Sequence, residues 1–293
     1  MSIWQAVEQA VSQGSGQSFS IRYRSVISGG SINSACRIEG DQHCYFIKLN
    51  QARRLEMFIA EADGLLELNK AKSIRVPKPV CYGEAEGKSW LVTEWITFGR
   101  ERGDSAEQLG RQLAAMHSYT SGQFGWFRDN TIGSTPQQNT QADNWLEFYR
   151  DRRLRLQFEL AARNGFTGAL QDKGERLMVD LEMFFTAYTP EASLLHGDLW
   201  GGNCAFDATG RPVIFDPAVY YGDREADVAM TELFGGFDAG FYAAYREAWP
   251  LDAGYSVRKT LYNLYHILNH ANLFGGGYAT QAEHMIDRLL AEI

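Results

Sequence analysis

The chain has 293 residues, of which 45% are hydrophobic and 22% charged, enough to bury the core of one large domain or of two lobes. Its formal net charge at pH 7 is −8, and no run of lysines or arginines stands out, which disfavours binding to nucleic acids or to anionic membranes. The densest basic stretch, residues 150–155, lies among apolar residues at helical spacing, so a solvated helix face is favoured there over a phosphate site.

The amino-terminal segment and the cysteines bear on the cellular compartment. Residues 1–13 contain Glu8 but no lysine or arginine, which argues against a signal or transit peptide. No apolar run approaches the 18 residues of a membrane span. The four cysteines are widely spread and form no C-x-x-C pair, as expected of a reduced protein without a disulfide or zinc framework. We therefore expect a cytoplasmic protein.

The first hundred residues predict a small lobe of antiparallel strands with one helix between them. A helical stripe begins the chain, and apolar alternation, turn signals and a second helical pattern follow. The predicted strands begin near residues 19 and 34 and cover 43–50 and 88–96, and the predicted helices cover 3–13 and 54–71. The V-P-K-P-V segment at 76–80 breaks the helical pattern.

From about residue 104 the pattern becomes mostly helical. Helices are expected over 105–120, 143–163, 167–188, 224–233, 241–249, 256–274 and 280–293, with one short buried strand near 212–217. The fold class is therefore α+β, with a bilobal organisation typical of protein kinases. We place the amino-terminal lobe at 1–97, a hinge at 98–103 and the carboxy-terminal lobe at 104–293.

Polar residues with the spacing of a phosphoryl-transfer site follow an apolar stretch in the second lobe. Asp198 lies in H-G-D-L-W-G-G-N, Asn203 follows five residues later, and Asp216 ends an apolar strand thirteen residues after that. The intervening F-D-A-T-G-R-P predicts a hairpin that returns Asp216 to the side of Asn203. An amide oxygen and a carboxylate can share Mg²⁺ there, while Asp198 stays free to accept a hydroxyl proton.

The same residues fit the protein-kinase pattern H-R-D-L-x-x-x-N followed by D-F-G, with two departures. Gly197 stands in place of the arginine, and D-P-A at 216–218 stands in place of D-F-G. The missing arginine is the usual partner of an activation-loop phosphate. This difference favours a constitutively organised small-molecule kinase over a phosphorylation-regulated protein kinase.

The first lobe supplies candidates for nucleotide binding. Lys48 lies near the end of a strand and can neutralise the α- and β-phosphates of ATP, and Glu61 on the following helix can hold it by an ion pair. Glu56 is the alternative partner, nearer the helix start. The remaining candidates are the turn residues Gly29, Gly30 and Ser31, whose amides can cover the phosphates, and the hinge residues Glu94, Trp95, Ile96 and Thr97, whose backbone can pair with adenine.

Each of these features also has an ordinary structural explanation. A strand lysine can be a surface residue, a glycine pair a hairpin turn, Asn203 a turn residue and Asp216 a helix cap. His196 is expected to brace the loop through hydrogen bonds rather than to act as a base. The chain nevertheless contains all six elements in the order that a bilobal kinase requires: the glycine turn, Lys48, Glu61, the hinge, the loop with Asp198 and Asn203, and Asp216. This order favours the functional interpretation.

At this level of detail the chain resembles the fructosamine kinase (ketosamine kinase) family, which has the aminoglycoside-phosphotransferase-like kinase fold. The resemblance covers essentially the whole chain and is carried by L-L-H-G-D-L-W-G-G-N-C-A-F, I-F-D-P-A-V-Y-Y-G-D-R-E-A-D-V-A-M and N-L-Y-H-I-L-N-H-A-N-L-F-G-G-G-Y. It implies phosphorylation, dependent on ATP and Mg²⁺, of a sugar hydroxyl on a fructosamine or ribulosamine, in deglycation repair.

The resemblance also implies roles for individual residues. Asp198 matches the proposed base, Asn203 and Asp216 the metal ligands, Lys48 and Glu61 the nucleotide-binding pair, and residues 94–97 the hinge. Trp200 is a candidate sugar platform, with a core aromatic as the alternative.

Two further positions concern structure and regulation. Asp227 resembles a helix aspartate that bonds the catalytic loop, and Arg224 is also expected to be structural. Some relatives carry a redox-active cysteine in the glycine turn, where this chain has Ser31, so we expect no disulfide switch at that position.

Two alternatives remain open at the sequence level. One is a kinase of the same fold with a different substrate, such as an aminoglycoside, choline or an amino sugar. The other is a nucleotide-binding scaffold without catalysis, although every catalytic element is intact. The expected partner is a small ketosamine or glycated amine, with neither nucleic acid nor membrane, and the sequence leaves the oligomeric state undetermined.

Overall fold

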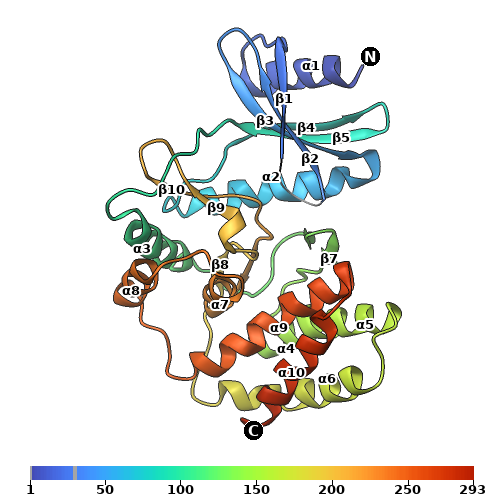
Figure 1. Ribbon diagram of the computed structural model, residues 1–293, viewed down its shortest axis with the longest axis vertical. Coiled ribbons are helices and arrows are strands. Elements are labelled where there is room, and N and C mark those ends of the chain that lie inside the picture. The colour runs from blue at the N-terminus through green and yellow to red at the C-terminus, as the bar shows by residue number, and fades with distance from the viewer. Residues whose placement is uncertain (1, 29–31) are drawn as a thin grey trace.

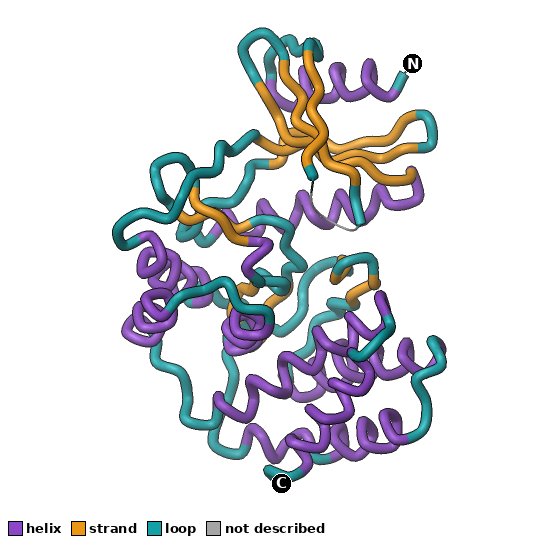
Figure 2. The backbone as a smooth tube through the Cα atoms, in the orientation of Figure 1, coloured by secondary structure: helices purple, strands orange, loops and turns teal. Residues whose placement is uncertain are grey.

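The computed structural model, which describes residues 2–28 and 32–293, has the predicted bilobal α+β architecture (Figure 1). A smaller part is built on one antiparallel sheet, and a larger part is mostly helical (Figure 2). The sheet's last strand ends at Glu94 and the first helix of the larger part begins at Ser105. The division at 1–97, 98–103 and 104–293 stays a prediction. No helix within the described ranges is long and apolar enough to cross a membrane.

The smaller part is a five-stranded antiparallel sheet covered by one helix on each face. Its strand order is β1-β2-β3-β5-β4. The strands are β1 (Tyr23–Ile27), β2 (Ser34–Glu39), β3 (Cys44–Gln51), β4 (Pro79–Ala85) and β5 (Lys88–Glu94), and the helices are α1 (Ile3–Ser15) and α2 (Leu55–Lys70). Ile47 packs in the cluster beneath α1. Because successive side chains of a strand point to opposite faces, Lys48 points toward α2.

Strand β4 was missed by the sequence prediction. Pro79 begins it, and Gly83 lies in its interior, so neither propensity nor alternation signals a strand. The tertiary structure explains the glycine, because a Cβ at Gly83 would lie 2.6 Å from the Trp90 ring of β5. Cross-strand packing therefore decides this element.

The larger part contains the predicted helices with local differences. Its helices are α3 (Ser105–His117), α4 (Trp145–Tyr149), α5 (Arg155–Arg163), α6 (Ala169–Val179), α7 (Glu225–Leu233), α8 (Ala239–Ala248), α9 (Tyr255–Phe274) and α10 (Tyr278–Leu290). Three antiparallel pairs join β6 (Asn130–Ile132) to β7 (Thr135–Gln137), β8 (Ser193–Leu195) to β11 (Tyr220–Gly222), and β9 (Cys204–Phe206) to β10 (Pro212–Ile214). Short helical turns cover Ala52–Arg54, Leu181–Phe185 and Gly201–Asn203.

The sequence suggested that the basic stretch at 150–155 is a solvated helix face, and this prediction is wrong for part of it. A π-helical turn, Arg150–Leu154, interrupts the predicted helix between α4 and α5. Within it Arg153 is fully buried, stacks on the Tyr220 ring and donates to the carbonyl of Gln138. A local charge pattern does not reveal that an arginine is buried, because its apolar stem and its aromatic neighbours decide this.

Helix α2 joins the two parts of the molecule. Leu65 and Leu68 pack into the main core of the larger part, and Gly64 lies against Val219. The Tyr221 hydroxyl donates to Glu67 at 2.8 Å. Figure 2 shows α2 beneath the sheet, facing the helical part. The helix therefore fixes the sheet relative to the loops of the larger part.

Backbone contacts hold the loop 196–203 at the junction. The loop follows β8. Its first two backbone N–H groups donate to the Asp227 carboxylate on α7, that of His196 at 2.6 Å and that of Gly197 at 2.8 Å. Gly197 has φ +80°, and a Cβ there would lie 2.1 Å from the Ala218 carbonyl oxygen. The loop thus passes so close to residue 218 that only glycine fits.

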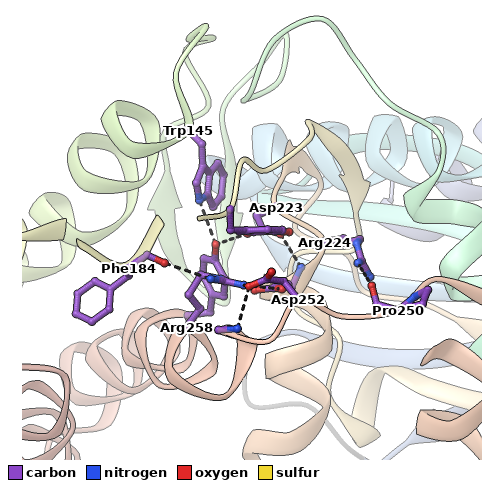
Figure 3. Close-up of polar contacts among 11 residues, drawn as sticks. Trp145, Phe184, Asp223, Arg224, Pro250, Asp252 and Arg258 are labelled. Carbon is purple, nitrogen blue, oxygen red and sulfur yellow. Dashed lines mark hydrogen bonds and ion pairs between the residues drawn. The ribbon is translucent and has the colours of Figure 1, made fainter. Parts of the chain in front are cut away.

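A buried polar network lies beneath this junction (Figure 3). The Arg258 guanidinium of α9 contacts Glu225 at 2.7 Å and Asp252 at 2.6 Å, and it also donates to the Phe184 carbonyl. Asp223 accepts from the hydroxyls of Tyr188 and Tyr262. The G-D-R-E segment, residues 222–225, is therefore buried structure, as predicted for Arg224.

Removal of the Arg258 charge should destabilise the fold. Arg258→Met leaves the Glu225 carboxylate buried without its cation, so we expect the free energy of unfolding to fall by about 3 to 5 kcal/mol. Urea denaturation followed by circular dichroism measures the change. Arg176→Met is the control, because that side chain is 69% exposed and lies 4.0 Å from Asp180. Equal effects of the two substitutions would contradict the role of the buried pair.

Gly197→Ala should be similarly costly through the backbone. Strain at positive φ and the clash with the Ala218 carbonyl together predict a loss of about 3 kcal/mol of unfolding free energy. Gly122→Ala is the matched control, since nothing lies within 4 Å of a Cβ there and its φ is not positive. Thermal melts of both variants test the prediction, and a wild-type melting temperature for Gly197→Ala would refute it.

Candidate active site

Lys48 lies between two carboxylates at the junction of sheet, helix and loop. Its Nζ is 2.6 Å from Glu61 Oε1 on α2 and 2.6 Å from Asp216 Oδ1 after β10. Burial opposes its charge, but the Asp216 and Glu61 carboxylates outweigh this and raise the pKa of Lys48. Lys48 therefore stays a cation although its side chain is only 9% exposed.

The structure selects Glu61 rather than Glu56 as the partner of Lys48. Burial raises the pKa of Glu61, and the Lys48 ammonium opposes that rise. Glu56 instead contacts Arg128 at 3.0 Å, with its side chain 79% exposed. Arg128 also binds Asp63, so this second ion cluster ties α2 to the loop after α3. The two glutamates thus face different neighbours on the same helix.

The predicted hairpin brings Asn203 and Asp216 together. In the β9–β10 pair Ile214 lies opposite Cys204, and the Phe215 N–H donates to the Asn203 carbonyl at 3.0 Å. Asn203 Nδ2 donates to the backbone oxygen of Asp198 at 2.8 Å and to its Oδ2 at 3.2 Å. Asp216 has φ +58°, an uncommon conformation that turns the chain directly after β10.

These contacts leave oxygen atoms available for a hard cation. Asn203 is 6% exposed, and within the described ranges its Oδ1 takes part in no hydrogen bond, because Nδ2 makes all the side-chain bonds. The Asp216 side chain is 46% exposed. The parts of the chain described by the structure contain no group of three or more His, Cys, Asp and Glu side chains suited to a metal. Asn203 and Asp216 offer one amide and one carboxylate oxygen, a donor set that fits Mg²⁺ because this ion keeps several waters.

Asp198 is half-buried beside this pair. Burial, together with the nearby Asp216 charge, raises the pKa of Asp198 to about 7, while the hydrogen bond from Asn203 opposes the rise. The carboxyl group therefore titrates near neutrality in the ligand-free protein. The Asp198 N–H donates to His196 Nδ1 at 3.3 Å.

His196 braces the loop, as the sequence indicated. Its Nε2 donates to the Phe215 carbonyl at 2.9 Å, which joins the loop to the end of the β9–β10 hairpin. Burial lowers the pKa of His196, so its ring is neutral, with Nδ1 as the acceptor. Burial also opposes charge on Asp227, but hydrogen bonds from His117 and from the loop hold its pKa below the ordinary value.

The predicted hinge lies where the sheet meets the β9–β10 hairpin. Glu94 ends β5, Ile96 is buried, and the Trp95 ring stacks under the Arg37 guanidinium. Gly99 N–H donates to the Phe206 carbonyl at 2.8 Å, which fixes the next segment. Among the described residues, the backbone of 95–97 makes no backbone hydrogen bond and remains available. Thr97 is exposed. Gly29, Gly30 and Ser31 lie outside the described residues.

Trp200 is an exposed aromatic at the edge of the loop, not a core residue. The residue is 41% exposed. Its ring covers Gly202, where an added Cβ would lie 2.3 Å from the indole. Phe234, 43% exposed, meets it edge-on with ring centroids 6.4 Å apart. The sequence analysis did not single out Phe234, which follows α7 in L-F-G-G-F-D, because nothing local relates it to Trp200.

Comparison with known proteins places the chain in a family. The profile described as fructosamine kinase matches residues 3–292. A Synechocystis protein named "Probable ketoamine kinase" is 49% identical over 98% of this chain and 97% of its own. The chloroplastic protein-ribulosamine 3-kinase of Arabidopsis thaliana is 46% identical over 90% of this chain and 81% of its own.

Solved structures agree with the bilobal kinase-like fold. A candidate fructosamine-3-kinase of Haemophilus somnus superposes with a TM-score of 0.90 at 28% identity, covering 98% of this chain and 97% of its own. The aminoglycoside phosphotransferase APH(4)-Ia superposes with a TM-score of 0.60 at 16% identity, over 97% and 98% of the two chains, and shows the shared fold. With its profile match across almost all residues and close relatives over nearly full length, the chain belongs to the fructosamine kinase family.

Proposed function

We propose that the protein is an ATP-dependent kinase that phosphorylates a sugar hydroxyl of a ketosamine, a fructosamine or ribulosamine. The observation that carries the proposal is the convergence of Lys48, Asp198, Asn203 and Asp216 at one junction. The printed names of the relatives, ketoamine kinase and protein-ribulosamine 3-kinase, supply the substrate class. A deglycation role follows from that class.

Lys48 serves the nucleotide in this proposal. Its ammonium is kept charged by Glu61 and Asp216, so it can neutralise the α- and β-phosphates without losing its position on β3. The free backbone groups of residues 95–97 serve the adenine edge. The turn residues Gly29, Gly30 and Ser31 stay proposed as phosphate-covering amides. A related fold supports nucleotide binding, since APH(4)-Ia was solved with AMP-PNP and hygromycin B.

Asn203 and Asp216 are the proposed ligands of Mg²⁺. When bound, the ion neutralises charge on the phosphates during transfer. The chain itself orients the ligand oxygens. The Asn203 Nδ2 donates to Asp198, which leaves the Asn203 Oδ1 without a hydrogen bond among the described residues. The turn at positive φ presents the Asp216 carboxylate to the junction.

Asp198 is the proposed base. It orients the sugar hydroxyl and accepts its proton as the hydroxyl oxygen bonds to the γ-phosphorus and the bond from that phosphorus to ADP breaks. Burial raises the pKa of Asp198, which favours its acceptance of a proton. Asn203 limits the rotation of the carboxylate, and the neutral His196 holds the loop, so positioning accounts for most of the chemistry. Trp200 is the proposed platform on which the C–H face of the sugar stacks.

Asp198→Asn should nearly abolish turnover while leaving nucleotide binding intact. We expect kcat to fall by roughly three orders of magnitude or more, because both the proton acceptor and the orientation of the hydroxyl are lost. The assay is ADP release with fructoselysine and ribuloselysine. Asp41→Asn, an exposed carboxylate on the β2–β3 turn, is the control. Near-normal kcat in Asp198→Asn would refute the assignment of the base.

Asp216→Ala should uncouple nucleotide affinity from Mg²⁺. In the wild-type protein, calorimetric titration with a non-hydrolysable ATP analogue is expected to show tighter binding with Mg²⁺ than with EDTA. The variant should show the same affinity under both conditions, since the carboxylate ligand is absent. A wild-type response to Mg²⁺ would exclude Asp216 as a ligand. Tight nucleotide binding without turnover of any ketosamine by the wild type would favour a scaffold.

A further inference from the structure

We propose that an exposed strip of aromatic rings beside the loop 196–203 binds the carbon chain of the amine that carries the sugar. The strip consists of Trp200, Phe234, His270 and Phe274. The proposal rests on the proposed function and specifies its substrate: a ketosamine whose amine bears an extended apolar chain, rather than the adduct of a small amine. It is carried by the contacts between the rings, by their exposure and by the backbone contacts that fix them.

The rings of the strip follow one another at contact distance. Trp200 and Phe234 meet edge-on, with ring centroids 6.4 Å apart. The rings of Phe234 and His270 are 5.0 Å apart, and those of His270 and Phe274 are 5.6 Å apart. Trp200 is two residues from Asp198 in the chain, and Phe274 is the last residue of α9. The strip therefore begins beside the proposed base and ends at the carboxy-terminal end of α9.

The rings remain open to solvent although they touch one another. Trp200 is 41% exposed, Phe234 43% and Phe274 57%, and His270 between them is half-buried. Single exposed apolar residues are ordinary on protein surfaces, whereas a connected set of them is typical of a surface that a ligand covers. Apolar contact with these rings would remove their exposed area from water, which is favourable.

Backbone contacts between two loops fix the first two rings relative to each other. The Trp200 ring lies over Gly202. A Cβ at the neighbouring Gly201 would lie 3.1 Å from the carbonyl oxygen of Gly235, and a Cβ at Gly236 would lie 3.0 Å from the Gly201 Cα. Glycine at these positions lets the loop after α7 lie backbone against backbone on the loop 196–203. The fold therefore builds the pair of rings as one surface.

Helix α7 positions both the loop of the proposed base and the second ring of the strip. Asp227 on α7 accepts from the first two N–H groups of the loop 196–203. Phe234 directly follows α7 and comes seven residues after Asp227. Seven residues are close to two helical turns, so the two residues lie on the same side of the helix. The side of α7 that holds the loop thus also presents the ring of Phe234 to Trp200.

A ketosamine presents its parts in the order that the strip requires. Its nitrogen is bonded to C1 of the sugar, so the carbon chain of the amine begins directly beside the sugar. With the sugar stacked on Trp200, the chain begins at the neighbouring ring, Phe234. A methylene chain gains free energy by covering apolar rings, and the cationic nitrogen at its start is attracted by aromatic faces. The strip therefore selects ketosamines by the length of their apolar chain.

The test compares two ketosamines that differ only in an uncharged alkyl chain. Fructosyl-methylamine and fructosyl-hexylamine carry the same sugar and the same cationic nitrogen, and turnover is followed by ADP release. For the wild type we expect a KM about tenfold lower for fructosyl-hexylamine, with similar kcat, because its chain buries apolar area while the reacting hydroxyl is unchanged. Equal KM values for the two substrates would overturn the proposal.

Substitutions along the strip test which rings bind the chain. Phe234→Ala should raise the KM for fructosyl-hexylamine about tenfold and leave that for fructosyl-methylamine unchanged. Phe234→Tyr keeps the ring and should retain both wild-type values. Phe274→Ala should have a smaller effect than Phe234→Ala, because its ring lies farther along the strip. An equal rise in both KM values in Phe234→Ala would indicate only a displaced Trp200, and a larger effect of Phe274→Ala would reverse the order; either result would overturn the proposal.

The control variant is Tyr82→Ala, which removes a 46% exposed aromatic from β4 in the sheet and should change neither KM. Turnover of both adducts without an effect of chain length would refute the strip and leave the proposed function intact. If neither adduct is turned over, nor their ribulosyl counterparts, the proposed function fails separately. Calorimetric binding of the two adducts to wild type and Phe234→Ala, with a non-hydrolysable ATP analogue present, then decides the strip: tighter binding of the hexyl adduct by the wild type alone supports it, and equal binding refutes it.

Discussion

The Lys48 ammonium, held between the carboxylates of Glu61 and Asp216, joins three separate parts of the chain. Lys48 comes from the sheet, Glu61 from α2 and Asp216 from the loop after β10. A buried cation requires opposite charge nearby, so the sheet, the helix and the loop are stable only in this mutual arrangement. The same arrangement leaves a permanent cation at the junction, where the proposed phosphates bind. Stability and the proposed chemistry thus depend on one contact.

The loop 196–203 is shaped by its backbone more than by its polar side chains. Asp227 holds two of its N–H groups, His196 ties it to the Phe215 carbonyl, and Gly197 passes against Ala218. An arginine at position 197 would collide with that carbonyl. The difference from the protein-kinase pattern is therefore a packing requirement here, as well as the loss of a phosphate partner. The fixed loop leaves Asp198 and Asn203 with little freedom.

The surface beside the loop bears on the choice of substrate. Trp200 and Phe234 are exposed aromatics whose rings meet edge-on beside the loop. The proposed platform at Trp200 fits a substrate that carries a sugar. An aminoglycoside phosphotransferase shares the fold, so the fold by itself does not choose between the two substrate classes.

The sequence by itself determined the elements whose signals are local. Hydrophobic periodicity identified most helices, and the ordered spacing of Asp198, Asn203 and Asp216, with its hairpin, identified the candidate site. The resemblance of longer motifs to fructosamine kinases pointed to the family. The sequence could not determine β4, the π-helical turn or the burial of Arg153, because these depend on Trp90 and Tyr220, residues remote in the chain. The tertiary structure paired Lys48 with Glu61, which the sequence had already favoured over Glu56, and it showed that Trp200 is exposed. It alone brought Phe234 beside Trp200, because contacts between distant segments are set by tertiary packing and leave no periodic trace.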